Sequence, residues 1–163
     1  MSVKREYVIP VLFGMVGLAV WMVTDFSVVE KISLLVLLFS AIMDFRTGFV
    51  NTTVIFCGVA AVFLINAPEY PSYDAFTNHT LLLALTAIAF RFASFFLEDK
   101  IGEGDVDIMT LILFSSGFAG FAKCLFYTCI IGTAYALVKR IKLKTPIPLA
   151  PLFYFGYMTA LLL

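Results

Sequence analysis

The sequence has few charged residues, a single histidine and no paired cysteines. Only 13% of its 163 residues are charged, whereas a soluble domain carries about 25%. The mean hydropathy is +1.03, and 62% of the residues are hydrophobic. These values exclude an ordinary soluble domain and predict a single membrane-embedded domain, residues 1–163, in contact with a lipid bilayer. Eleven basic residues balance eleven acidic ones, so nothing indicates a nucleic-acid partner.

The scarcity of metal-binding side chains limits the kinds of site that the chain can form. Cys57, Cys124 and Cys129 lie inside apolar runs and form no C-x-x-C pair, so we interpret them as packing residues. His79 is the single histidine and lies beside a polar loop. We therefore predict neither a disulfide nor a metal site.

Apolar runs divide the chain into about seven segments, since a helix needs roughly 20 apolar residues to cross a bilayer. The predicted segments are Val8–Val23, Val28–Phe45, Thr52–Asn66, His79–Leu97, Val106–Ser116, Phe118–Val138 and Leu149–Leu163. The sequence thus predicts an all-α integral membrane protein, a polytopic bundle of six to seven transmembrane helices. One extra N-terminal helix in residues 1–27 precedes a core in residues 28–163. The "SSGFAG" break after the short fifth segment allows a tight hairpin that does not cross the full membrane.

The basic residues predict a multi-pass protein of the cytoplasmic membrane with its N-terminus inside, because cytoplasmic loops carry the Lys and Arg excess. In this orientation the basic residues on the cytoplasmic side are Lys4, Arg5, Arg46, Lys100, Lys139, Arg140, Lys142 and Lys144. Lys31 and Lys123 fall outside this set. The same orientation brings Asp44 and Asp105 to one depth near the cytoplasmic face.

These two aspartates attract attention because carboxylates at the edge of a bilayer are costly. Asp105 belongs to "IGEGDVDIM", and Asp44 lies 61 positions earlier. Two aspartates a few ångströms apart share one proton, so one can activate water while the other protonates a carbonyl oxygen, as in aspartic proteolysis. We expect Gly102 and Gly104 to allow positive φ and close approach of a peptide, and Asp105 to cap the next helix. The plainer interpretation is a solvated residue at each helix end.

Three motifs resemble one protein family. "GEGD" resembles the GxGD motif of intramembrane aspartyl proteases, and "DFRTGFVN" is similar to the D-x-R-x-x-x-I-P-N signature of type IV prepilin peptidases and archaeal preflagellin peptidases. "TPIPLAPLFYFG", Thr145–Gly156, resembles the proline-rich start of that family's last helix. The resemblance implies a membrane aspartic endopeptidase, without a cofactor, that removes short basic leaders from prepilin-like or preflagellin-like membrane proteins. It implies Asp44 and Asp105 as the catalytic pair. The supporting positions are Arg46, Asn51, Gly102 and Gly104.

The chain departs from the family pattern in three ways. Val50 stands where the family usually has proline, and Asp107 stands where a lysine commonly follows the GxGD aspartate. The sequence also lacks the N-terminal cysteine-rich region that bifunctional members use for N-methylation. The resemblance therefore implies a short-form peptidase without methyltransferase activity.

Other charged residues near the GxGD motif have predicted roles. A candidate binding site for a basic leader is the acidic cluster Glu98, Asp99 and Glu103. Asp107 should point away from Asp105, because two positions along a helix correspond to about 200° of rotation. Arg91, at helix depth, is expected to give structural support by pairing with a carboxylate such as Glu98.

Two other functions fit the same residues. A non-catalytic bundle, such as a small transporter or an assembly subunit, could use Asp44 and Asp105 to handle ions or protons. A presenilin-like GxGD protease is the second alternative, since "YD" occurs at Tyr73–Asp74. That pair lies in a predicted outer loop, however, and the P-A-L signature of that group is absent from residues 148–152.

Overall fold

The computed structural model describes residues 24–69, 71–96, 102–139 and 148–163, together with residue 19. Every regular element in these ranges is helical, which confirms the all-α prediction there. The elements in chain order are α2 (Val28–Thr47), α3 (Thr52–Asn66), the short 3₁₀ helix η1 (Ala67–Glu69), α4 (Tyr73–Phe96), α5 (Glu103–Lys139) and α6 (Leu149–Leu162). The first predicted segment, Val8–Val23, lies outside the described residues apart from residue 19.

The prediction of seven spanning helices is wrong for the described part of the chain. By length and composition, two helices there are long and apolar enough to cross a membrane, Tyr73–Phe96 and Glu103–Val138, and the second is counted across a break at Gly117. The helices α3 and α6 are apolar but have 15 and 14 residues, about 22 Å of helix against a hydrocarbon core of about 30 Å. The helix α2 has charged residues in its first and last turns. The apolar runs identify helices correctly, but their number does not give the number of spans.

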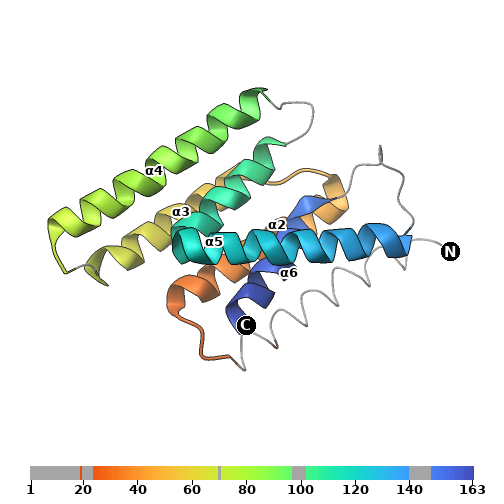
Figure 1. The fold of residues 1–163 in the computed structure, drawn as a ribbon, viewed down its shortest axis with the longest axis horizontal. Coiled ribbons are helices and arrows are strands. Elements are labelled where there is room, and N and C mark those ends of the chain that lie inside the picture. The colour runs from red at the N-terminus through yellow and green to blue at the C-terminus, as the bar shows by residue number, and fades with distance from the viewer. Residues whose placement is uncertain (1–18, 20–23, 70, 97–101, 140–147) are drawn as a thin grey trace.

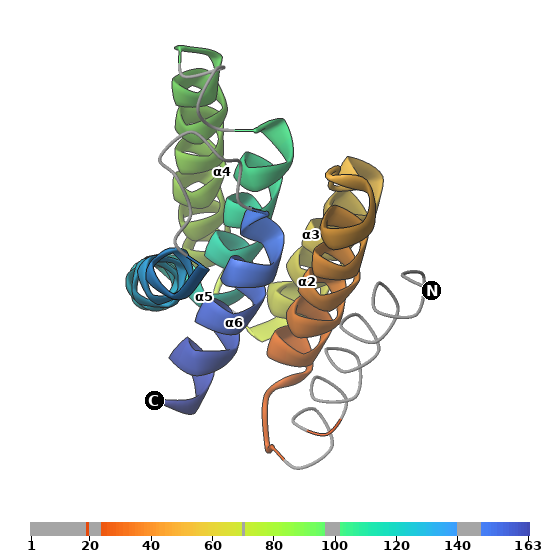
Figure 2. The ribbon, with the colours of Figure 1, turned by 90° about the vertical axis from the view of Figure 1, so that its right-hand side faces the viewer.

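The predicted fifth and sixth segments form the single element α5, which is broken at Gly117. This glycine has φ 66° and ψ −173°, a left-handed conformation that residues with a Cβ rarely adopt. In Figure 2 the part of α5 before the break is seen from the side and the part after it is seen end-on. The break therefore turns the chain into a new direction across the bundle, and the predicted tight hairpin does not form.

The helix α4 begins six residues earlier than the predicted segment, at Tyr73 instead of His79. Ser72 explains the earlier start, because its hydroxyl accepts a hydrogen bond from the Ala75 N–H at 3.1 Å, as helix-capping serines do. Asp74 thus lies in the first turn of a helix. The loop placement predicted for the "YD" pair was wrong.

The core lies between α2, α3, α5 and α6, and α6 runs through its centre between α5 and α2 (Figure 2). Leu37, Ile55, Leu111 and Tyr157 are fully or almost fully buried there. Figure 1 shows α4 on the outside of this bundle, where it packs mainly against α5. Large apolar side chains along α4 are more than half exposed: Leu81, Leu85, Ile88, Phe92 and Phe95. An apolar surface of this kind suits contact with lipid.

Candidate active site

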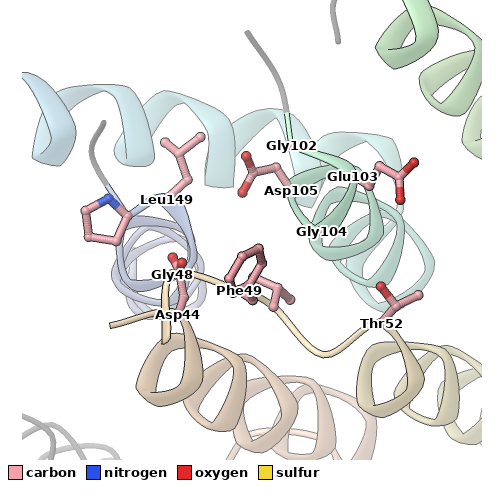
Figure 3. A pocket seen from close by; sticks show the side chains of 11 residues that line it. Asp44, Gly48, Phe49, Thr52, Gly102, Glu103, Gly104, Asp105 and Leu149 are labelled. Atoms are coloured by element: carbon pink, nitrogen blue, oxygen red, sulfur yellow. The ribbon is translucent and has the colours of Figure 1, made fainter. Parts of the chain in front are cut away.

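A cavity of about 440 Å³ lies where three distant segments of the chain meet. The first segment contains the end of α2 and the loop to α3, the second is the start of α5, and the third is the start of α6 (Figure 3). The lining residues are Asp44, Gly48, Phe49, Val50, Thr52, Gly102, Glu103, Gly104, Asp105, Pro148 and Leu149. The three sequence motifs therefore contribute to one cavity.

Asp44 lies in the last turn of α2 and contacts the first turn of α6. Gly48 ends α2 in a left-handed conformation with φ 71°, and its N–H donates to the Asp44 carbonyl oxygen at 2.8 Å. The Ala150 N–H donates to Oδ2 of Asp44 at 3.2 Å. Because Pro148 gives α6 no side-chain cap, the Asp44 carboxylate satisfies an N–H group that the helix itself leaves free. This bond fixes the Asp44 side chain at the cavity.

Asp105 lies inside the first turn of α5, which begins at Glu103 and not at Val106 as predicted. Its N–H donates to the Gly102 carbonyl oxygen at 3.1 Å. It is therefore a helical residue, and its carboxylate accepts a hydrogen bond from the backbone N–H of Gly102 just before the helix. The prediction that Asp105 caps a free N–H group is confirmed. A carboxylate in the first turn is also favoured by the free N–H groups of the helix end.

The two aspartates face one cavity from different helices. Figure 3 shows Asp44 on the side of α2 and α6, and Asp105 on the side of α5. Both line the cavity, and the charge of Asp44 acts on the Asp105 carboxyl group. Asp107, in contrast, lines a second cavity of about 320 Å³ between α3, α4 and α5. The prediction that Asp107 points away from Asp105 is confirmed.

The glycines of the GxGD motif act through close packing. The positive-φ glycines in the described ranges are Gly48 and Gly117, so the positive φ predicted for Gly102 and Gly104 was wrong. Close approach occurs instead, because a Cβ on Gly104 would lie 2.7 Å from Cβ of Val50. Gly104 thus allows the start of α5 to lie against the loop that follows Asp44.

Replacing Gly104 with alanine should lower the activity of this site about 100-fold, since a displacement of about 1 Å at a reactive site costs that much. Val50 cannot relieve the contact by rotating, because its own Cβ is the nearest atom. Catalytic rates per folded protein would test this, and Val50→Gly combined with Gly104→Ala should recover part of the loss. Val50→Gly alone is the control. Equal rates for Gly104→Ala and wild type would contradict the packing argument.

Asn51 and Arg46 lie near the cavity without contributing to its lining. The Asn51 side chain accepts hydrogen bonds from the N–H groups of Thr53 at 3.0 Å and Val54 at 3.4 Å, so it caps α3. With Gly48 it fixes both ends of the loop between α2 and α3. The Arg46 side chain is exposed in the last turn of α2.

The predicted acidic cluster is described only in part. Glu103 is exposed and lines the cavity, whereas Glu98 and Asp99 lie outside the described residues. Phe49, Thr52, Pro148 and Leu149 also line the cavity and were not predicted as site residues. The proline-rich motif was the signal that could have indicated the last two.

The fold and the cavity define a helical membrane protein with a site formed by two carboxyl groups. Its sequence matches the type IV leader peptidase family over residues 32–137, which is more than half of the chain, and the protein belongs to that family. Family membership makes it a protease. The matched residues include Asp44 and the GEGD motif, while α6 lies beyond them. Comparisons with curated proteins and with solved structures gave no match.

Proposed function

We propose that this protein is an aspartic endopeptidase of the cytoplasmic membrane that removes short basic leaders from prepilin-like or preflagellin-like precursors. The observation that carries the proposal is the shared cavity of Asp44 and Asp105 in a member of the leader peptidase family. The cavity, at about 440 Å³, lies within the usual size range of ligand sites, about 300–1,000 Å³. The excess of basic residues supports the cytoplasmic location of the site.

In the proposed reaction the two carboxyl groups share one proton and hold a water molecule between them. The ionised carboxylate takes a proton from the water, whose oxygen attacks the scissile carbonyl carbon. The protonated carboxyl gives its proton to the carbonyl oxygen, so the tetrahedral intermediate carries no net charge. One hydroxyl of the intermediate then returns a proton to the carboxyl group that protonated the carbonyl oxygen. The carboxyl group that took a proton from the water gives that proton to the amide nitrogen. The C–N bond breaks and the pair again holds one proton.

Cleavage of a defined precursor tests the proposal. Purified protein in detergent should shorten a type IV prepilin with a basic leader at one position, as read by mass spectrometry of the new N-terminus. The same precursor without its leader should stay intact, as should the full precursor treated with an enzyme carrying Asp44→Ala and Asp105→Ala. If wild-type protein left every leader-bearing precursor intact, the result would favour the non-catalytic alternative and contradict the proposal.

The acidic cluster should accelerate capture of the basic leader mainly at low ionic strength. Replacing Glu98 and Glu103 by Gln and Asp99 by Asn should lower kcat/KM roughly three- to tenfold at about 0.01 M salt, where charges act over about 30 Å. At about 1 M salt the screening length is about 3 Å, so the difference should vanish. Asp25→Asn with Asp74→Asn is the matched control, since both side chains are exposed, Asp25 before α2 and Asp74 in the first turn of α4. An equal loss at both salt concentrations would contradict leader capture by charge.

A further inference from the structure

Arg91 joins α4 to the start of α5 through two contacts. Its Nη1 lies 3.1 Å from Oδ1 of Asp107, and the same nitrogen donates a hydrogen bond to the Glu103 carbonyl oxygen at 3.4 Å. Glu103 and Asp107 lie two positions before and two positions after Asp105. One guanidinium group therefore contacts the helix on both sides of a proposed catalytic residue.

Burial makes Asp107 dependent on this partner. The Asp107 side chain is 15% exposed and that of Arg91 is 49% exposed. The second oxygen of Asp107 is buried without a hydrogen-bond partner among the described residues. Removing Arg91 would leave the mostly buried Asp107 carboxylate without its partner charge, which is destabilising, although less so than in a fully buried pair because Arg91 itself is half exposed. Without Arg91, the first two turns of α5 would hold an unpaired carboxylate in the second cavity, two positions from Asp105.

The ion pair between Arg91 and Asp107 connects α4, on the outside of the bundle, to α5. The helix α4 packs mainly against α5, and Phe76 near its start contacts Phe63 of α3. Both contacts of Arg91 are made by Nη1, which the rigid, planar guanidinium group holds in a more defined direction than the flexible lysine side chain holds its ammonium group. The contacts of Arg91 thus connect α4 to the first two turns of α5 at two points, Glu103 and Asp107.

We propose that Arg91 is a positioning residue for leader cleavage, which holds Asp105 at the cavity by binding Asp107 and the Glu103 carbonyl group. The inference rests on the proposed function. It assigns Asp107 a role through its ion pair with Arg91, at a distance from the reacting atoms. Loss of the pair should therefore lower kcat, because the carboxyl group is misplaced, and should leave KM nearly unchanged, because the leader still binds.

A double-mutant cycle tests the pair, with rates expressed per folded enzyme. Arg91→Gln should lower kcat roughly 10- to 100-fold with KM within about twofold, by analogy with other displaced catalytic groups. Asp107→Asn should cost less, about three- to tenfold, because Arg91 keeps its bond to the Glu103 carbonyl group. The double variant should be no slower than Arg91→Gln alone, since both changes break the same contact. Arg91→Lys should lie between Arg91→Gln and wild type.

Lys123→Gln is the matched control, since it removes one basic charge from an exposed side chain in the second part of α5. Its kcat should equal that of wild type. Wild-type kcat in Arg91→Gln, or losses that multiply in the double variant, would overturn the inference and leave the proposed function intact. A change confined to the yield of folded protein would also overturn it. A wild-type enzyme that cleaves no leader would overturn both.

Discussion

Replacing either Asp44 or Asp105 with asparagine is expected to abolish leader cleavage, with a fall in kcat of at least about 1,000-fold. General acid–base catalysis by one group contributes about 10²–10⁴-fold, and here each carboxyl group serves as donor in one step and acceptor in another. Asparagine keeps the size of the side chain, but its amide group cannot give or take a proton as a carboxyl group does. The Ala150 N–H, which donates to Asp44, would still find the amide oxygen, so the fold should persist.

The double variant Asp44→Asn with Asp105→Asn should be no slower than either single variant, because groups that act as a unit are not additive. Asp74→Asn is the matched control. Asp74 is exposed in the first turn of the 24-residue α4, about 36 Å from the other end of that helix. Its rate should equal that of wild type. Full loss in Asp74→Asn with retained cleavage in Asp44→Asn would instead favour the presenilin-like alternative, in which the "YD" pair supplies one aspartate.

Gly156→Ala should be the most destabilising single methyl addition at the contact between α5 and α6. The new Cβ would overlap Oγ1 of Thr128, and it would also lie 2.9 Å from the Thr128 nitrogen and 3.0 Å from the Cys124 carbonyl oxygen. Rotating Thr128 removes only the first contact, so the two helices must separate. Forced overpacking typically costs about 1–3 kcal/mol, and we expect the upper end of that range. Cleavage should fall as well, because α6 carries the N–H group that binds Asp44.

Thermal unfolding in detergent would measure the effect, with Gly132→Ala as the control at the same helix contact. A Cβ on Gly132 would meet only Cδ1 of Leu152, at 3.3 Å, and the end of a leucine side chain can move. Gly132→Ala should therefore unfold close to the wild-type temperature. Thr128→Ala should rescue Gly156→Ala only in part, since two backbone contacts remain. Complete rescue by Thr128→Ala, or equal destabilisation by Gly156→Ala and Gly132→Ala, would contradict the close approach of α5 and α6 at Gly156.

Local signals in the sequence were enough to predict which segments meet at the candidate site. Asp44 was predicted near the end of one helix and Asp105 near the start of another, and the order of the segments predicted that the two lie at one end of the bundle. The structure agrees, and the three motifs line one cavity. Helical rotation alone also separated Asp107 from Asp105. These inferences succeeded because helix periodicity and helix ends depend on neighbouring residues.

Inferences that depend on distant contacts or on single torsion angles failed. Asp107 stands where a lysine is common in the family, and the sequence did not explain this change of charge, because the partner of Asp107, Arg91, lies on another helix. The start of α5 was predicted three residues too late, since the glycines of "GEGD" suggested a turn, whereas Gly104 is helical and packs on Val50. The direction of the chain after Gly117 depends on one backbone conformation, which composition does not specify.

The hydrogen bond between Asp44 and Ala150 also has a consequence for the order in which the parts of the proposed site are synthesised. The two residues are 106 positions apart, and α6 supplies one wall of the cavity. A ribosome adding roughly 5–20 residues per second needs about 5–20 s to make the intervening chain. Throughout that time Asp44 has already been synthesised while the helix that orients it has not. Under the proposed function, a partly made protein would lack the N–H group that binds Asp44, and cleavage would begin only after α6 has packed into the bundle.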